Sequence, residues 1–185
     1  MESFYILFLD IDGVLHRPWD LPATTTLEEH VNKFSTEAVQ NLSYVLEQIY
    51  KRTGKYTFVV LSSSWRKHGD VERLRQLFKQ WPFAGFIVDK TPMGGFNQRP
   101  AEIVERLGVW CKQHKVINYI VIDDYPIGME VFGPCYIRTC ERKLLTKENA
   151  DEAVKNMLNK SEVTKEHVDD LSTKLAIPLY SELIL

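Results

Sequence analysis

The stretch from Phe4 to Leu15 reads FYILFLDIDGVL, and it indicates the fold more clearly than any other part of the chain. Its first six residues are all apolar, which is typical of a strand buried on both faces in a parallel sheet covered by helices. Two acids, Asp10 and Asp12, follow at once, and Gly13 lets the chain turn sharply so that both acids can approach one point. We therefore expect a central strand that ends at a group of carboxylates.

Short apolar runs alternate with segments of helical period along the rest of the chain. Residues 58–61 and 119–122 are apolar runs of the same kind, and residues 86–88 and 135–138 are weaker candidates for strands. Between the strands, the sequence predicts helices that begin at Ser35, Asp70, Pro100 and Thr146, the first of them ending near Gly54. This alternation predicts an α/β fold with a doubly wound, Rossmann-like parallel sheet of about five strands and helices on both faces.

The length of 185 residues allows one compact domain and little more. We expect residues 1–160 to form that domain, in which residues 16–34 have no clear period and form a short flap after the first strand. Residues 161–185 are expected to add an accessory helix and an apolar tail. The tail end, Leu183–Leu185, could pack on the core, dock a partner or another domain, or mark the place where a longer protein was cut.

Composition and charge describe an ordinary soluble globular protein, with 23 Lys and Arg against 25 Asp and Glu. A net charge of -2 gives no global electrostatic reason to bind nucleic acid or an anionic membrane. No apolar stretch is long enough to span a membrane, and no N-terminal signal is recognised, so we expect a cytoplasmic protein, with secretion by a route that needs no such signal left open. The cysteines, Cys111, Cys135 and Cys140, are odd in number and are expected to be reduced.

Polar side chains follow three of the apolar runs at the points where the strands are expected to end. In open parallel sheets, ligands bind at this edge. Several carboxylates that gather there would repel one another, and a divalent cation that prefers oxygen ligands, above all Mg²⁺, resolves the repulsion. The residues concerned are Asp10 and Asp12 after the first run, Ser62, Ser63 and Arg66 after the second, and Asp123 and Asp124 after residues 119–122.

These motifs resemble those of the haloacid dehalogenase-like (HAD) phosphatase superfamily. Residues 8–15 look like its first motif, Ser62 like the second, and Ile122-Asp123-Asp124 like the fourth. The string LSSSWR at residues 61–66 is similar, more narrowly, to the HAD domains associated with RNA-repair (Swiss Army Knife) proteins. Thr91-Pro92 and the stretches at residues 99–103 and 138–146 also fit that subgroup. The resemblance spans residues 1 to about 158, and it implies a HAD-like fold with a minimal cap or none.

The resemblance implies a phosphomonoester phosphatase with an aspartyl-phosphate intermediate. Asp10 would attack phosphorus, and Asp12 would protonate the leaving oxygen and then activate water. The magnesium ligands would be Asp10, the backbone carbonyl of Asp12 and Asp123, with Asp124 orienting that shell. Ser62 would donate a hydrogen bond to a phosphoryl oxygen, and Ser63 is a further candidate for substrate binding.

The superfamily typically has a lysine in its third motif, and this sequence departs from that pattern. The best-placed cation is Arg99, at the start of a predicted helix, and Lys90 is its competitor. Arg66 has two interpretations that stay open: a second contact to phosphate, or a structural ion pair. Trp65 is expected to be a core residue rather than a platform for a nucleic-acid base.

The short flap implies an open site, which favours a phosphate carried by a macromolecule, either a nucleic-acid end or a phosphorylated protein. His16, Arg17, Trp19 and the basic run at residues 66–68 lie near the expected mouth and could hold a phosphodiester backbone, or could form a solvated loop. Two alternatives remain: an uncapped phosphatase for phosphotyrosine or small sugar phosphates, and a degenerate HAD domain that binds a partner without catalysis. His30, His114 and His167 are expected to be surface residues.

Overall fold

Five parallel strands form a single sheet in the computed structural model, which describes residues 3–94, 98–159 and 162–175. The strand order across the sheet is β3-β2-β1-β4-β5. The expectation of a doubly wound α/β fold is confirmed. The strands are β1 (Ser3–Leu9), β2 (Thr57–Leu61), β3 (Ile87–Lys90), β4 (Lys115–Asp123) and β5 (Tyr136–Arg138).

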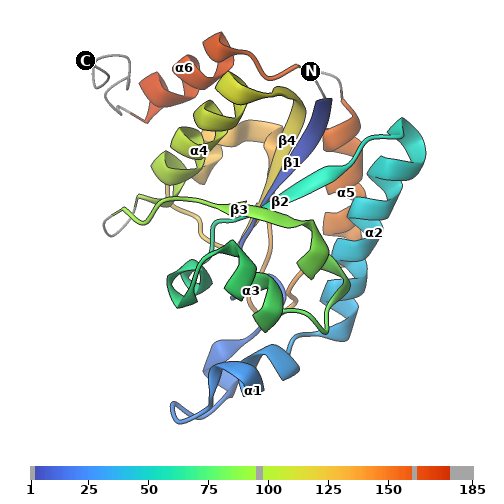
Figure 1. The fold of residues 1–185 in the computed structure, drawn as a ribbon, viewed down its shortest axis with the longest axis vertical. Coiled ribbons are helices and arrows are strands. Elements are labelled where there is room, and N and C mark those ends of the chain that lie inside the picture. The colour runs from blue at the N-terminus through green and yellow to red at the C-terminus, as the bar shows by residue number, and fades with distance from the viewer. Residues whose placement is uncertain (1–2, 95–97, 160–161, 176–185) are drawn as a thin grey trace.

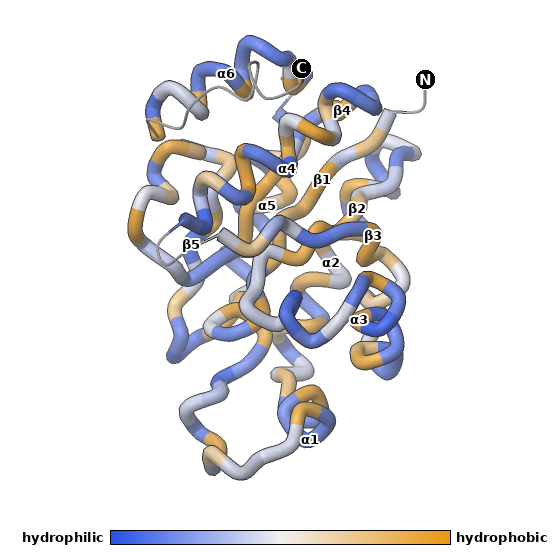
Figure 2. Tube along the Cα trace, turned by 60° about the vertical axis from the view of Figure 1, so that its left-hand side comes forward, coloured by the Kyte–Doolittle hydropathy of each residue, from blue (hydrophilic) through white to orange (hydrophobic). Residues whose placement is uncertain are grey.

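Helices cover both faces of this sheet (Figure 1). On one face, Tyr5, Leu7 and Leu9 of β1 join a core built with α2 (Thr36–Thr53), α3 (Val71–Leu77) and α5 (Lys147–Leu158). On the other face, the alternate β1 residues Phe4, Ile6 and Phe8 pack with α4 (Arg99–Gln113) and α6 (Lys165–Lys174). Because successive side chains of a strand point to opposite faces, the all-apolar β1 contributes to both cores. Figure 2 shows this concentration of apolar residues in β1 and β4.

Side-chain caps begin three of the four predicted helices where the sequence placed them. Ser35 Oγ accepts a hydrogen bond from the Ala38 N–H at 3.2 Å, and an Asp70 carboxylate oxygen accepts one from the Arg73 N–H at 2.8 Å. Thr146 caps α5 in the same way, and α2 ends at Gly54, whose φ of +67° favours glycine. These local signals were sufficient because each depends on residues within one helical turn.

The flap at residues 16–34 holds more structure than the sequence predicted. It contains the short 3-10 helix η1 (Pro18–Asp20) and the helix α1 (Leu27–Asn32), which begins with a capping box between Thr26 and Glu29. A helix of six residues is too short to show a repeating apolar face, so the sequence does not predict it. In Figure 1 the flap lies at the opposite end of the molecule from α6.

The accessory helix α6 packs against α4. Val168 and Leu171 are buried in the same core cluster as residues of α4, and Val168 lies beside Gly108. The predicted apolar end at residues 183–185 lies outside the described residues. Its predicted role in docking a partner or another domain therefore stays a prediction. Within the described part of the chain, none of the helices combines the length and the apolar character needed to cross a lipid bilayer.

Candidate active site

The site lies where the strand order reverses, between β1 and β4. The two strands pair in parallel up to Leu9 and Ile122, and the Asp10 N–H then donates to the Ile122 carbonyl at 3.0 Å. Asp10 therefore follows the end of β1 directly beside Asp123, the last residue of β4. In open α/β sheets, the crevice at this point is the usual place for a ligand.

Three carboxylates meet at this edge. Oxygens of Asp10, Asp123 and Asp124 all lie within 4.8 Å of one another. Asp10 and Asp123 are buried, whereas Asp124 is partly exposed. The structure thus brings together three of the four acids that the sequence placed at a metal site.

Arg99 is the cation that reaches these carboxylates. It is the first residue of α4, and its Nη1 donates to Asp10 Oδ2 at 2.5 Å and to Asp123 Oδ2 at 2.8 Å. Its competitor Lys90 points elsewhere, because its Nζ donates to the backbone carbonyls of Arg66 and Gly69 at 2.9 and 2.5 Å. Of the two cations that the sequence offered for the third motif, the geometry favours Arg99.

The charges at this edge are only partly balanced. Burial raises the pKa of Asp123 well above its usual range, the charge of Asp10 raises it further, and Arg99 opposes the rise. Burial also raises the pKa of Asp124 to about 6, again with a contribution from Asp10. Burial alone would lower the pKa of Arg99, but Asp10 and Asp123 outweigh that effect and raise it.

This set of donors fits a hard divalent cation. Carboxylate oxygens are the ligands that Mg²⁺ prefers, and one guanidinium offsets only one of the three negative charges of the ionised cluster. Asp10, Asp123 and Asp124 are the side chains that would hold the ion.

Gly13 makes room for the third of these carboxylates. Its φ is +78°, and a Cβ at this position would lie 2.1 Å from Asp124 Oδ2. Any other residue would therefore suffer backbone strain and would also collide with the Asp124 carboxylate. Gly13 of the first motif thus leaves space for Asp124 of the fourth motif. Their spacing in the sequence does not reveal this contact.

The Asp12 side chain contacts other groups and is not part of the carboxylate cluster. Its Oδ1 lies 2.9 Å from His16 Nδ1 and accepts a hydrogen bond from Trp65 Nε1 at 3.0 Å. The carboxyl group is 30% exposed, so it can meet a substrate. The carboxylate cluster found among the described residues does not include the side-chain oxygens of Asp12. A contact between Asp12 and a metal ion would therefore come from its backbone carbonyl, which is the ligand that the resemblance implies.

The loop after β2 supplies one buried hydroxyl that has no hydrogen-bond partner among the described residues. Ser62 is fully buried, and its Oγ finds no hydrogen-bond partner among the described residues. Ser63 has a structural contact instead, because its Oγ accepts a hydrogen bond from the Trp65 N–H at 3.4 Å and caps the 3-10 helix η2 (Ser64–His68). A buried, unpartnered hydroxyl is costly unless a ligand satisfies it, which fits the expected contact of Ser62 with a phosphoryl oxygen.

Arg66 forms a buried ion pair. Its Nη2 donates to Glu102 Oε2 at 2.5 Å, and its Nη1 donates to the Ser62 carbonyl at 2.5 Å. Both side chains are less than 10% exposed. Of the two interpretations left open by the sequence, the geometry favours the structural one. The sequence did not predict that Glu102 is the partner of Arg66. An acidic residue on a predicted helix is normally expected to face solvent.

The three histidines expected at the surface are partly exposed, and each also makes a ring contact. His30 Nδ1 lies 3.1 Å from His16 Nε2 within the flap. His114 packs against Phe4, and His167 Nε2 lies 3.1 Å from the Tyr119 hydroxyl. Each is only partly exposed. Helical spacing could not reveal these contacts, because the partners come from other elements.

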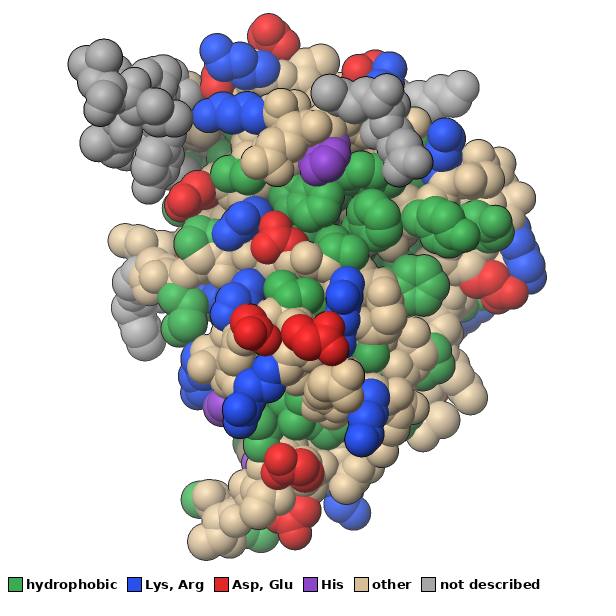
Figure 3. Space-filling model, in the orientation of Figure 1, with side chains coloured by type: hydrophobic (Ala, Val, Ile, Leu, Met, Phe, Trp, Pro, Cys, Tyr) green, Lys and Arg blue, Asp and Glu red, His purple; other side chains and the backbone are tan. Residues whose placement is uncertain are grey.

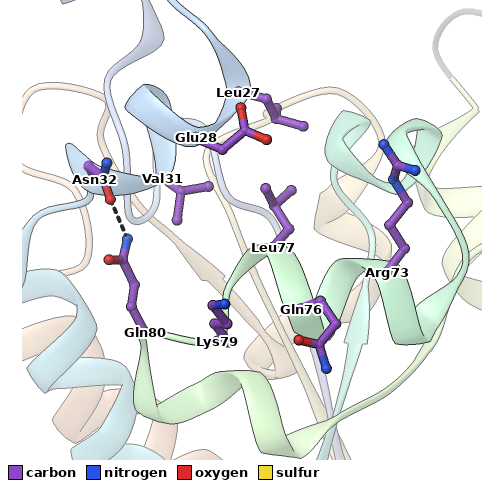
Figure 4. Close-up of a pocket in the computed structure, with 9 residues that line it drawn as sticks. All are labelled: Leu27, Glu28, Val31, Asn32, Arg73, Gln76, Leu77, Lys79 and Gln80. Atoms are coloured by element: carbon purple, nitrogen blue, oxygen red, sulfur yellow. Dashed lines mark hydrogen bonds between the residues drawn. The ribbon is translucent and has the colours of Figure 1, made fainter.

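A separate hollow of about 400 Å³ lies between α1 and α3 (Figure 4). Apolar side chains of Leu27, Val31 and Leu77 line it, with Arg73 and Lys79 beside them. Its described lining includes none of the predicted site residues. The carboxylate cluster, and not this hollow, is therefore the candidate active site.

The parallel sheet and the carboxylates at its switch point define the class of the protein as a HAD-like α/β domain. The chain belongs to the family described as the HAD domain in Swiss Army Knife RNA repair proteins, whose family model matches residues 6–150. The resemblance inferred from the motifs is confirmed. Comparison with curated proteins and with solved structures found no match.

Proposed function

We propose that this protein is a Mg²⁺-dependent phosphomonoester phosphatase that acts through an aspartyl-phosphate on Asp10. Membership of the HAD family supports a function of the phosphatase type. The observation that carries the proposal is the meeting of Asp10 and Asp123 at the switch point, both in contact with Arg99. A structural domain has no need to bury two acids side by side, since their repulsion costs stability.

We assign a role to each side chain. Asp10 is the nucleophile, and Arg99 offsets the charge that spreads over the phosphoryl oxygens during transfer. Ser62 Oγ donates a hydrogen bond to one of these oxygens. Asp12 gives a proton to the leaving oxygen and later takes one from water. Mg²⁺, when held by Asp10, Asp123 and Asp124, supplies further charge neutralisation for the phosphoryl group.

The substrate that we favour is a phosphate carried by a macromolecule, either a nucleic-acid end or a phosphorylated protein. The support is the small size of the flap, whose only α-helix, α1, has six residues among those described. On the face seen in Figure 3, acidic and basic side chains are interspersed. This pattern does not favour nucleic acid over phosphoprotein, so both belong in a substrate panel.

The first experiment measures phosphate release from an aryl phosphate with Mg²⁺ and then with EDTA. We expect turnover to need the metal and to fall at least about 1,000-fold in Asp10→Asn, because the nucleophile is lost. The matched control is Asp151→Asn, which changes an exposed acid on α5 and should leave turnover unchanged. Turnover that survives in Asp10→Asn would contradict the mechanism. A folded protein that binds Mg²⁺ but hydrolyses neither aryl phosphates nor the macromolecular panel would favour the binding module.

A further inference from the structure

The carboxyl group of Asp12 is held on one side only. His16 Nδ1 and Trp65 Nε1 both reach Oδ1, at 2.9 and 3.0 Å. No hydrogen bond to Oδ2 is found among the described residues. An oxygen that accepts two hydrogen bonds has little capacity to carry a proton as well, so the acidic proton belongs on Oδ2.

The two donors come from different parts of the chain, and each is fixed by its surroundings. His16 is 1% exposed, and the turn that follows Asp12 returns it to this carboxyl through the hydrogen bond from the Gly13 N–H to the His16 carbonyl. Trp65 is buried against Phe34 and Phe78, with ring centroids 5.6 Å apart in both pairs. Neither donor can turn away without disturbing its packing.

A third group continues the chain of hydrogen bonds into the flap. His30 Nδ1, on α1, lies 3.1 Å from His16 Nε2. One arrangement of protons gives both ring nitrogens of His16 a partner: His30 Nδ1–H donates to His16 Nε2, and His16 Nδ1–H donates to Asp12 Oδ1. In that arrangement His16 acts as a donor toward the acid.

We infer that Trp65 and His16 are positioning residues that hold the Asp12 carboxyl by Oδ1, so that Oδ2 is the atom that exchanges protons with the substrate. The inference rests on the proposed function. In the first step, the Asp10 oxygen bonds to phosphorus while the bond from phosphorus to the leaving oxygen breaks, and the proton on Asp12 Oδ2 passes to that oxygen. In the second step, water bonds to phosphorus, Oδ2 takes a proton from it, and the bond from Asp10 to phosphorus breaks to release phosphate.

Dependence on the leaving group separates this role from a merely structural one. A good leaving group such as 2,4-dinitrophenolate needs little help from an acid, whereas phenolate needs much more. We expect Trp65→Phe to lower kcat/KM for phenyl phosphate about 10-fold, and for 2,4-dinitrophenyl phosphate less than about 2-fold. The ratio kcat/KM covers the steps up to the aspartyl-phosphate, so it reports on Asp12 as an acid.

Three comparisons sharpen the test. Trp110→Phe is the matched control, since it also removes an indole hydrogen bond to a carboxylate, from Nε1 to Asp89 Oδ2 at 2.8 Å, away from the acid. His16→Asn keeps an N–H near the position of Nδ1 and should retain more activity on phenyl phosphate than His16→Leu. In an Asp12→Asn background, Trp65→Phe should have little further effect, because the group that it positions is already gone.

An NMR measurement tests the contact without any need for turnover. In ¹H–¹⁵N spectra, the Trp65 indole signal should shift in Asp12→Asn, and the Trp110 signal should not. The inference would be overturned if Trp65→Phe lowered kcat/KM equally for both substrates, or if the Trp65 signal did not move in Asp12→Asn. In either case, turnover that depends on Asp10 would still support the phosphatase. Turnover independent of Asp10 would overturn the proposed function and the inference together.

Discussion

Arg66 and Glu102 show how burial decides the role of a charged side chain. Their charged groups are 2.5 Å apart, and both side chains are almost fully buried. In the low dielectric of the interior, either charge alone would be strongly disfavoured. The pair also links η2, which carries Trp65, to α4, which begins with Arg99. The ion pair therefore holds η2 and α4 together.

We predict that Arg66→Met lowers the free energy of unfolding by about 3 kcal/mol, because it leaves Glu102 buried without its partner. The double variant Arg66→Met/Glu102→Met should recover a large part of that loss. Urea denaturation measures both. Lys51→Met is the control: Lys51 pairs with Glu47 at the surface, where both side chains are more than half exposed, and its loss should cost less than about 1 kcal/mol. Unchanged stability in Arg66→Met, with a raised KM, would restore the interpretation as a phosphate contact.

At the scale of elements, α6 is attached to the sheet through apolar and polar contacts. Val168 and Leu171 supply buried apolar surface, and His167 Nε2 lies 3.1 Å from the hydroxyl of the buried Tyr119 on β4. Burial lowers the pKa of His167, Asp170 opposes the change, and Lys174 adds to it. The folded protein therefore disfavours protonation of this imidazole.

The pH dependence of stability follows from that direction. In an unfolded chain, histidine becomes protonated as the pH falls through about 6.5, whereas His167 in the folded protein becomes protonated only at lower pH. The contribution to stability is thus fully present above about pH 6.5 and is lost as the pH falls toward the folded pKa. We predict that the Tm of the wild type falls more steeply between about pH 7.5 and 5 than the Tm of His167→Gln. Parallel curves for the two proteins would contradict this account of how α6 is held.

At the scale of the whole molecule, the sheet gathers acids from separate parts of the chain. Asp10 follows β1, and Asp123 and Asp124 lie at the end of β4, yet their oxygens lie within 4.8 Å of one another. Folding therefore creates a site of concentrated negative charge that the unfolded chain does not possess. A cation that binds this site stabilises the folded state by mass action.

We predict that Mg²⁺ at about 100 times its Kd raises the free energy of unfolding by about 2.7 kcal/mol. The increase should vanish in Asp123→Asn, because one of the charged ligands becomes a neutral amide, and it should persist in Asp151→Asn. Thermal denaturation with Mg²⁺ or with EDTA provides the measurement. An equal gain for Asp123→Asn and the wild type would place the metal elsewhere.

Much of this fold could be predicted because its signals are local. The apolar run of residues 4–9, the caps at Ser35, Asp70 and Thr146, and the glycine at the end of α2 each depend on neighbouring residues. The parallel arrangement then brings the ends of the strands to one edge, so Asp10 and Asp123 could be paired before the structure was known. Short elements such as α1 could not be predicted, because six residues are too few to show a helical period of apolar residues.

The tertiary structure decided which partner each site residue takes. Arg99 rather than Lys90 reaches Asp10, Glu102 pairs with Arg66, and Trp65 reaches Asp12 across 53 positions of sequence. Spacing along the chain determines which elements form and at which edge their ends meet. It does not determine the direction of a long side chain, because that direction depends on packing among elements far apart in sequence, where small differences in burial and charge select one contact over another.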